Sequence, residues 1–320
     1  MALEIKKNEL LKNHSTFRIG GPARYFAEPS SEEEIREALN FAAQKNLPLF
    51  VFGRGSNILF RDEGFDGLVI KIKNPAQTTD ARWSGGQKLK IKDSGIEAGA
   101  GVFLAQVIKS SRDAGLTGLE WGMGIPGTLG GCVADNCGAY GHSISEFVKS
   151  VLVLARNGEI KRYSAEECLF EYRGSRFKGG EGREIILEVE LALKEQTEGG
   201  CQPSLEEILV KRREKSVSHP SAGSIFKNIV IEKLDNKEEF MGKIPAEKIK
   251  GGKFPAGWLI EQCGLRGKQI GGAKIAEEHC NYIVNTGEAR AADVLDLIKL
   301  CKESVREKFG VILEEEIVVV

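Results

Sequence analysis

The sequence lacks a long hydrophobic run. No stretch approaches the ~20 consecutive apolar residues that a membrane-spanning helix needs, which argues against such a helix. The N-terminal residues, MALEIKKNELLKNH, contain no apolar segment of the kind found in export signals. We therefore expect a cytoplasmic protein without a membrane partner.

An excess of charge of either sign is also absent. Lysine and arginine together number 45, aspartate and glutamate 46, and the formal net charge is -1. This balance argues against a nucleic-acid groove or a polybasic membrane patch, so an anionic ligand must be bound by locally placed basic residues. The hydrophobic share of 41% and the length of 320 residues are typical of a globular chain with two or three domains.

Cysteine and histidine do not have the spacing of a metal site. The seven cysteines are scattered and form no CxxC, and the four histidines form no HExxH. An odd number of cysteines without a pattern indicates reduced thiols and not a disulfide framework. We expect no metal.

Glycine is abundant, with 38 residues, many of them clustered. The clusters stand among apolar residues, where surface loops are uncommon. Because glycine suits tight turns and close approach of the backbone to a ligand, we interpret them as ligand-binding segments, with loop-rich surface as the alternative. They lie at 53–55, 99–101, 122–131 and 271–272.

Helix and strand patterns mix along the chain and predict an α+β fold. Ser30 with Glu33 has the form of a capping box, and Gly115 and Gly310 are predicted helix ends. We expect a hairpin or an irregular excursion over 77–93 and a linker over 195–203. The predicted helices begin at Ser30, 102, Ser204 and Pro255 and cover 291–309; the predicted strands cover 49–52, 68–72, 150–155, 184–193 and 311–320.

The segment Gly122–Gly127 matches GxGxxG, the dinucleotide fingerprint, to the letter. That motif needs a strand before it and a helix opening inside it. Residues 115–118 are a poor strand, and Pro126 followed by Thr-Leu-Gly-Gly argues against a regular helix. We therefore reject a Rossmann interpretation and keep only the expectation that backbone N–H groups here could converge on an anion.

Several segments together resemble the UDP-N-acetylenolpyruvoylglucosamine reductase family. They occur in order over nearly the whole chain, and the ordered set is specific where no single block is. They are STFRIGG at 15–21, GRGSNIL at 53–59, GLEWGMGIPGTLGG at 118–131 with GAYG at 138–141, YRGSR at 172–176, AGSIFKN at 222–228, AGWLIE at 256–261, QIGG at 269–272 and LEEEI at 313–317.

The resemblance implies an FAD-binding domain of the vanillyl-alcohol-oxidase (PCMH) type and a C-terminal α+β substrate-binding domain. The implied boundaries are 1–73 with the closing strand 311–320, then 74–198, then 199–310 for the substrate domain. FAD is the implied cofactor. The residues implied to bind it are Gly53, Arg54, Gly55, Ser56, Asn57, Ile58, Gly118, Gly124, Ile125, Pro126, Gly127, Thr128, Gly130, Gly131, Asn136, Gly138 and Ala139.

The implied reaction uses NADPH to reduce UDP-N-acetylglucosamine enolpyruvate to UDP-N-acetylmuramate, a step of cell-wall (peptidoglycan) precursor synthesis. Hydride addition to the enolpyruvyl group leaves negative charge on the substrate, so the site must supply positive charge and a proton. The family pattern assigns Arg173 to the substrate carboxylate, Ser224 to donating the proton, and Glu316 to stabilising the intermediate or relaying a proton. The alternatives are a solvated arginine and an ordinary turn serine.

Glu314, Glu315 and Glu316 are consecutive, so in an extended segment they cannot all face the same way. The alternative is a terminal strand with both faces exposed to solvent. Only the family resemblance selects Glu316 from the three. Lys227, three residues after Ser224, could assist it if the turn folds back.

Five further residues are candidates for substrate binding. Arg212 and Lys215 are three apart on a predicted helix and could bind a diphosphate or a carboxylate, with a solvated basic face as the alternative. The family pattern adds Tyr172, Asn228 and Gln269.

The sequence departs from the family pattern at four positions. Asp135 stands where methionine is usual, Cys132 and Cys137 where alanine is more common, and Ile229 where proline is expected. The span from Arg176 to 204 is short, so the chain resembles the subclass without a tyrosine-bearing lid loop.

Two rival functions stay open at this point. A flavin oxidase acting on an alcohol would share the FAD domain without Ser224 or Glu316, and a nucleotide-binding regulatory module would carry no flavin. We expect a monomer that binds NADPH and the enolpyruvyl sugar nucleotide and no nucleic acid.

Overall fold

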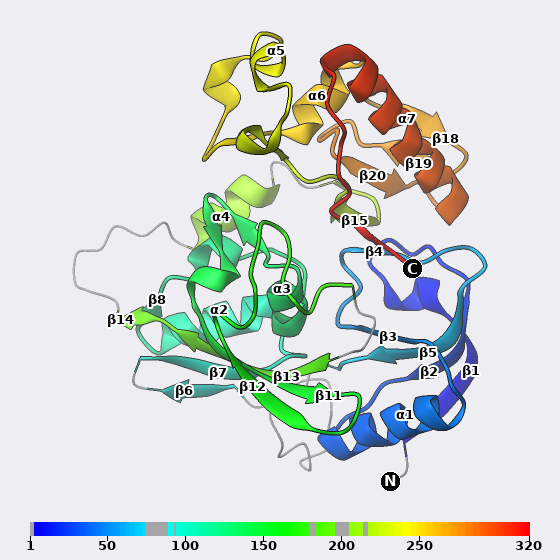
Figure 1. Ribbon diagram of the computed structural model, residues 1–320, viewed down its shortest axis with the longest axis vertical. Helices are drawn as coiled ribbons and strands as arrows, with labels where there is room; N and C mark the ends of the chain where they lie inside the picture. Colours follow the sequence, from blue (N-terminus) through cyan, green and yellow to red (C-terminus); the bar gives the residue numbers. More distant parts are fainter. Residues whose placement is uncertain (1–2, 74–88, 93, 180–183, 196–204, 214–216) are drawn as a thin grey trace. The chain divides into compact units, whose positions relative to one another are not determined.

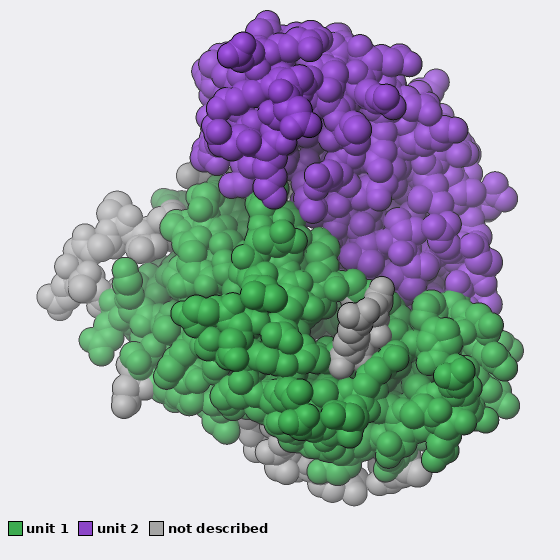
Figure 2. Space-filling model, in the orientation of Figure 1, with its two compact units in different colours: residues 1–9, 23–54, 65–214 green, residues 10–22, 55–64, 215–320 purple. Residues whose placement is uncertain are grey.

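The computed structural model describes residues 3–73, 89–92, 94–179, 184–195, 205–213 and 217–320. The chain has two compact units, coloured separately in Figure 2. Unit 1 comprises 1–9, 23–54 and 65–214, and unit 2 comprises 10–22, 55–64 and 215–320. The predicted boundaries 1–73, 74–198 and 199–310 stay a prediction.

Unit 1 begins with a four-stranded sheet of order β1-β2-β5-β3. Its strands are β1 (Ile5–Leu10), β2 (Pro22–Ala27), β5 (Phe65–Lys71) and β3 (Leu49–Phe52), and β5 is parallel to both β2 and β3. Helix α1 (Glu32–Gln44) connects β2 to β3 and buries the predicted apolar stripe against the sheet. The strand predicted at 49–52 is confirmed.

The start of α1 differs from the prediction by one residue. Ser31, not Ser30, is the N-cap, and its side chain accepts a hydrogen bond from the Glu34 N–H at 3.1 Å. The Glu34 carboxylate in turn accepts from the Ser30 hydroxyl at 2.8 Å. Two adjacent serines and three adjacent glutamates fit the capping box in two registers, and the sequence pattern alone does not separate them.

The second sheet of unit 1 is antiparallel, with order β12-β11-β13-β7-β6. Helices α2 (Leu104–Asp113) and α3 (Leu129–Ala134) cover one face of it (Figure 1). The predicted strands at 150–155 and 184–193 and the predicted helix at 102–114 are confirmed within a few residues. The strands are β12 (Ile160–Ser164), β11 (Val148–Ala155), β13 (Glu184–Ala192), β7 (Gly95–Gly99) and β6 (Lys90–Lys92).

Helix α3 contradicts the expectation that no regular helix follows Pro126. It begins at Leu129, and the Thr128 hydroxyl caps it by accepting from the Gly131 N–H at 3.3 Å. Leu129 and Val133 are fully buried, so packing against the sheet outweighs the poor helix propensity of two consecutive glycines. The Rossmann interpretation remains excluded, because this sheet is antiparallel.

Short elements complete unit 1. The predicted helix cap at Ser204 and the segments 77–88 and 196–203 lie outside the described residues; the described helix α4 covers Leu205–Arg213. The other elements are β8 (Leu116–Thr117) paired with β14 (Lys194–Glu195), β9 (Gly138–Ala139) paired with β10 (His142–Ser143), η3 (Glu120–Gly122) and η4 (Ile144–Glu146).

Unit 2 is built around α7 (Ala291–Phe309), which coincides with the predicted helix and ends at Gly310 with φ +74°. It packs on a sheet of order β15-β20-β19-β18 and on α6 (Ala256–Gln262). The strands are β15 (Ser221–Ser224), β20 (Tyr282–Asn285), β19 (Ala273–Ile275) and β18 (Gln269–Ile270). The shorter elements are η1 (Leu11–His14), β4 (Ile58–Leu59), β16 (Ile229–Val230), η5 (Ile231–Lys233), α5 (Lys237–Met241), η6 (Ala246–Lys248), β17 (Lys253–Phe254) and β21 (Val318–Val319).

The closing strand is much shorter than the predicted 311–320. Only β21 pairs as a strand, in parallel with β4, and Glu315 makes an isolated bridge with Phe226. Different parts of this segment form hydrogen bonds with different neighbours. The Glu314 carbonyl accepts from the Lys227 N–H, whereas the Val318 N–H donates to the Asn57 carbonyl. Since no single neighbouring strand runs beside all ten residues, a continuous ladder cannot form.

Within the part of the chain that the structure describes, none of the helices combines the length and the apolar character that crossing a lipid bilayer requires.

Candidate cofactor and active site

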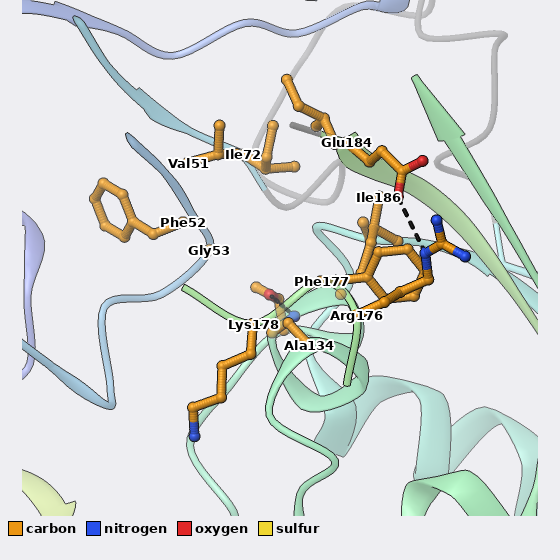
Figure 3. Close-up of a pocket in the computed structure, with 15 residues that line it drawn as sticks. Val51, Phe52, Gly53, Ile72, Ala134, Arg176, Phe177, Lys178, Glu184 and Ile186 are labelled. Carbon is orange, nitrogen blue, oxygen red and sulfur yellow. Dashed lines mark hydrogen bonds and ion pairs between the residues drawn. The ribbon is translucent and has the colours of Figure 1, made fainter. Parts of the chain in front are cut away.

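Unit 1 contains a cavity of about 300 Å³ between the end of β3 and the start of α3 (Figure 3). That volume is at the lower end of ligand sites and suits part of a dinucleotide. Many of its lining side chains are small, so the protein backbone lies close to the free space. The lining residues are Val51, Phe52, Gly53, Ile72, Ala100, Thr128, Gly130, Gly131, Ala134, Arg176, Phe177, Lys178, Glu184, Ile185 and Ile186.

Two glycines of the cavity wall are required by close contact. A Cβ on Gly53 would lie 2.2 Å from Thr128 Oγ1, and 3.0 and 3.1 Å from the two carbons of that side chain. A Cβ on Gly130 would lie 2.7 Å from the Cβ of Ala100. These contacts join three segments from distant parts of the sequence, 53, 100 and 128–130, in one wall. The wall fits a cofactor that needs the backbone close to it, as FAD does.

The first N–H groups of α3 are used within the protein. Leu129 donates to the Val102 carbonyl at 2.8 Å and Gly130 to the Ala100 carbonyl at 2.9 Å, and the Gly131 N–H is bound by Thr128. We expected this loop to present N–H groups to an anion. At 129–131 those groups instead hold α3 in place.

Two cationic side chains line the cavity, and each has a carboxylate partner. Lys178 Nζ lies 3.4 Å from Asp135 Oδ1, and Arg176 Nε lies 3.2 Å from Glu184 Oε2, the contact drawn in Figure 3. The Arg176 guanidinium also stacks on the Tyr163 ring, 3.8 Å from its centroid. A hydrogen bond from Tyr163 to Glu184 raises the pKa of that phenol.

Lys178 and Glu184 are cavity residues that the sequence motifs do not predict, and Arg176 has no predicted role. Arg176 ends a family block, which is a signal that could have found it. Lys178 and Glu184 are brought to the cavity by the fold alone.

Arg173 is held in a strained conformation beside the predicted cofactor residue Gly138 and the predicted substrate residue Tyr172. Its φ is +58°, which is uncommon for a side chain with a Cβ. Its Nη2 donates to the Gly138 carbonyl at 2.9 Å, and its guanidinium carbon lies 5.5 Å from the Tyr172 ring centroid. Strain of this kind concentrates at functional sites, which supports a role for Arg173 beyond that of a solvated loop residue.

Asn136 holds in place the segment that carries Arg173. The residue is buried, with φ +43°, and its amide donates to the Glu171 carbonyl at 2.8 Å while its oxygen accepts from the Ser145 N–H at 3.2 Å. The predicted cofactor residue therefore serves the protein itself, fixing the segment that carries Tyr172 and Arg173.

Other predicted residues of unit 1 pack within the protein. Gly118 donates to the Glu120 carboxylate, and a Cβ there would lie 2.7 Å from the Phe147 ring. Ile125 packs on the core of the second sheet, and the Gly127 carbonyl accepts from Leu104. Ala139 lies in β9, opposite His142.

Arg212 lies on α4, against the predicted flavin loop. Its Nη2 donates to the Trp121 carbonyl at 3.1 Å, its guanidinium carbon lies 5.4 Å from the Tyr140 ring centroid, and its Cδ would be 2.7 Å from a Cβ on Gly124. The solvated basic face that was the alternative does not describe this contact set. Lys215 lies outside the described residues.

Unit 2 brings Ser224 and Glu316 to neighbouring backbone positions. Ser224 ends β15, and the carbonyl of the next residue, Ile225, accepts from the Glu316 N–H at 2.8 Å. Asn57 Nδ2 donates to the Glu316 carbonyl at 3.2 Å, and the Asn57 carbonyl accepts from Val318 at 3.0 Å. The turn predicted to bind FAD is thus attached to the segment that carries the predicted acid.

The three consecutive glutamates have different surroundings. Glu314 is exposed and lies 3.3 Å from Lys227 Nζ, and Glu315 lies 2.7 Å from Lys302 Nζ. Glu316 is the one with intermediate exposure. Since Lys227 pairs with Glu314, the structure gives no support to the idea that it assists Ser224.

Two residues that the sequence analysis did not select hold this part of unit 2. Thr16 donates from its N–H to the Gly55 carbonyl at 3.1 Å and from its hydroxyl to the Ser221 carbonyl at 2.8 Å. Asn281 is buried and binds both the N–H and the carbonyl of Phe226. Thr16 lies in a family block, whereas an isolated buried asparagine such as Asn281 gives no signal in one sequence.

The remaining predicted substrate residues are placed differently. Asn228 accepts from the Ala256 N–H at the start of α6, at 3.3 Å. Gln269 lies on β18, at the edge of the sheet opposite the edge formed by β15 with Ser224. The two intervening strands separate them by ~14 Å, so the structure does not bring Gln269 and Ser224 together.

Among the described side chains, His, Cys, Asp and Glu form no cluster of three or more with the arrangement of a metal site.

Two family models match the chain. The FAD binding domain matches residues 23–164, and the C-terminal domain of UDP-N-acetylenolpyruvoylglucosamine reductase matches residues 215–320. The expected α+β class, with an FAD-binding domain followed by a C-terminal domain, is confirmed.

Curated relatives extend the match over the full chain. The UDP-N-acetylenolpyruvoylglucosamine reductase of Syntrophomonas wolfei is 36% identical over 317 residues, covering 99% of this chain and 95% of the relative. The enzyme of the same name from Agathobacter rectalis is 38% identical, covering 98% and 93%.

A solved structure agrees with both. The crystal structure of the UDP-N-acetylenolpyruvylglucosamine reductase of Thermus caldophilus superposes with a TM-score of 0.71 at 32% identity, covering 100% of this chain and 99% of the other. With the FAD domain, the C-terminal domain and full-length relatives in agreement, the chain belongs to the UDP-N-acetylenolpyruvoylglucosamine reductase family of FAD-binding oxidoreductases.

Proposed function

We propose that the protein reduces UDP-N-acetylglucosamine enolpyruvate to UDP-N-acetylmuramate with NADPH, using bound FAD, in peptidoglycan precursor synthesis. Family membership over the full chain supports the reaction. One structural observation supports the roles given to Ser224 and Glu316. Ser224 directly precedes Ile225 in unit 2, and the Ile225 carbonyl accepts a hydrogen bond from the Glu316 N–H.

FAD fits the residues of unit 1. In the cavity wall, a Cβ added at Gly53 would collide with Thr128 and one added at Gly130 would collide with Ala100. A wall that requires glycine at these positions suits a ligand that packs against the backbone. When bound, FAD would supply hydride transfer between NADPH and C3 of the enolpyruvyl group.

The residues of the chain would then manage charge and the proton. Arg173 is preorganised, because the Gly138 carbonyl and Tyr172 hold its guanidinium, and its planar fork suits the substrate carboxylate. Negative charge that develops beside that carboxylate would be stabilised by this guanidinium. Ser224 and Glu316 are the candidates for delivering the proton to C2 of the substrate.

Arg212 is our candidate for the substrate diphosphate. Its Nε is buried and has no hydrogen-bond partner within the described part of the chain, while Nη2 is held by the Trp121 carbonyl. Tyr172 is retained as a substrate contact, and Lys215, Asn228 and Gln269 stay predictions from family resemblance.

A cytoplasmic monomer is part of the proposal. The six described cysteines are all free thiols, which suits a reducing compartment. Light scattering on the purified protein tests the monomer, and a mass that is a multiple of the chain mass would overturn it.

The proposed proton donor is tested by measuring the two half-reactions separately. In Ser224→Ala we expect reduction of the bound flavin by NADPH at a rate close to that of the unmodified protein. Reoxidation by the enolpyruvyl sugar nucleotide should slow by ~10²–10⁴-fold, because general acid catalysis contributes about that much. Stopped-flow absorbance of the flavin measures both rates.

The matched control is Ser221→Ala, on the same strand as Ser224. Its backbone carbonyl accepts from Thr16, and that contact survives the substitution. We expect both half-reactions to be unchanged. Equal slowing of both half-reactions in Ser224→Ala would contradict the proton-donor role, and no oxidation of NADPH in the presence of the sugar nucleotide would contradict the proposed reaction as a whole.

A further inference from the structure

The end of α3 places two cysteines side by side. Cys132 lies in the helix, and Cys137 follows its end. Cys137 donates its N–H to the Cys132 carbonyl at 2.8 Å, Asn136 donates to the Val133 carbonyl at 3.2 Å, and Asn136 is left-handed. These are the two crossed hydrogen bonds and the left-handed residue of a Schellman motif, which brings the side chains at the two outer positions together. Here both side chains are thiols.

The two thiols differ in accessibility. Cys132 is 3% exposed, and Cys137 has intermediate exposure while packing on the same core. A hydrogen bond with Cys137, followed by burial, raises the pKa of Cys132 well above its ordinary value. Reagents in solution therefore reach Cys137 first, and Cys132 lies directly behind it.

We propose that Cys132 and Cys137 form a modification site that a low-molecular-weight disulfide, such as oxidised glutathione, converts to an intramolecular disulfide. The Cys137 thiolate attacks one sulfur of glutathione disulfide, forms a mixed disulfide and releases one glutathione thiolate. The Cys132 thiol loses its proton to solvent, attacks the Cys137 sulfur and releases the second glutathione. Two protein thiols are oxidised to one S–S bond, and the glutathione disulfide is reduced to two thiols.

The backbone geometry suits such a bridge. A disulfide needs α-carbons within ~7 Å and Cβ atoms directed toward each other. The 2.8 Å hydrogen bond between Cys137 N and Cys132 O brings the two backbones together, and the hydrogen bond between the thiols shows that the side chains face each other. Cys168 packs in the same core and is fully buried, so it offers an internal comparison.

The bridge would fix the end of a helix that lines the cavity. Gly130, Gly131 and Ala134 of α3 all contribute to the cavity wall. The inference itself does not depend on the proposed reaction, because it concerns two thiols and a small disulfide.

The test is to incubate the purified flavin-loaded protein with oxidised glutathione at pH 8 and to map thiols by mass spectrometry. We expect the loss of two of the seven thiols, a mass lower by two hydrogen atoms, and a bridge between Cys132 and Cys137 in the unreduced peptide map. Dithiothreitol should restore both thiols. Recovery of both cysteines as free thiols, or of Cys137 as a stable glutathione adduct in the unmodified sequence, would overturn the proposal.

Three variants separate the two roles. Cys132→Ser should accumulate the glutathione adduct on Cys137, because the second thiol is missing. Cys137→Ser should leave Cys132 unmodified, whereas Cys168→Ser should form the bridge as the unmodified sequence does. A bridge or adduct on Cys132 in Cys137→Ser would contradict the order of attack, and loss of the bridge in Cys168→Ser would contradict the pairing. The map of the unmodified sequence decides the pairing even if a variant fails to fold.

Discussion

The predicted site residues of the two units are built in different ways. In unit 1 they are mostly glycines and small residues, pressed against backbone or side chains from elsewhere in the sequence, as Gly53 is against Thr128. In unit 2 they are polar side chains whose backbone is fastened on both sides, as at Glu316 between Ile225 and Asn57. The difference indicates that retaining a cofactor requires room, whereas presenting a reactive side chain requires anchoring of the chain that carries it.

The largest expected effect tests the requirement for room. Gly53→Ala places a Cβ 2.2 Å from Oγ1 of the buried Thr128, and moving that oxygen away would break the hydrogen bond by which it caps α3. Overpacking of this kind costs about 1–3 kcal/mol, so we expect FAD to bind ~10- to 100-fold more weakly. Fluorescence titration of the apoprotein with FAD measures the affinity.

Gly242→Ala is the control for that variant. A Cβ at Gly242 would meet its nearest atom at 3.5 Å, an ordinary contact, and its φ of -66° is accessible to alanine. FAD affinity should be unchanged there. Unaltered FAD affinity in Gly53→Ala would contradict this difference between the two units, because the cavity wall would then accommodate an added methyl group.

The next effect compares the two anchoring asparagines. Asn136→Ala removes a buried amide that makes two part-buried hydrogen bonds, to the Glu171 carbonyl and the Ser145 N–H, and we expect a loss of ~2 kcal/mol in the free energy of unfolding. Asn57→Ala removes the hydrogen bond to the Glu316 carbonyl from a half-buried amide and should cost ~1 kcal/mol. Urea denaturation measures both losses.

The two variants should differ in function as well as in stability. Asn57→Ala should slow reoxidation of the flavin by substrate more than reduction by NADPH, because it releases the segment of Glu316. If Asn57→Ala left reoxidation untouched while Asn136→Ala slowed it, anchoring of Glu316 would not be what the turn contributes.

The smallest expected effect concerns the face of the second sheet that points away from the core. Hydrogen bonds from Lys92 hold the pKa of Glu97 below its ordinary value. A lowered folded pKa stabilises the protein above the unfolded value of ~4.3 and loses this contribution as the pH falls through the folded value. Glu97→Gln should therefore lower the Tm by ~1–4 °C at pH 7, and the difference should shrink as the pH falls through the lowered pKa of Glu97.

A Tm difference in Glu97→Gln that stayed constant from pH 7 to pH 3 would contradict this assignment of cause. Calorimetry at several pH values, with Glu195→Gln as an exposed control on β14, measures the difference.

Local patterns predicted those elements whose burial repeats at regular spacing. Helix α7 and strand β3 coincide with the prediction, because an apolar stripe or a run of buried residues specifies them without reference to the rest of the chain. Helix α3 was missed because Leu129 and Val133 are buried by a sheet whose strands lie elsewhere in the sequence. The closing strand was overextended because pairing depends on neighbours that the segment itself does not reveal.

The same distinction between local patterns and distant neighbours applies to the residues of the candidate site. The ordered motifs selected Gly53, Arg173 and Glu316 together with residues that contact them, namely Thr128, Gly138 and Asn57. Lys178, Glu184 and Asn281 entered only with the fold. Gln269 shows the converse, since it belongs to a motif while the sheet order places it at the opposite edge from Ser224.

The sequence by itself determined the family, the α+β class and the residue types that the chemistry requires, because these follow from motif order and from periodicity. The tertiary structure alone decided which glycines need to be glycine, which of three consecutive carboxylates is half-buried, and which two cysteines touch. Each of these depends on distances between segments far apart in the chain, and such distances are fixed only when the core packs.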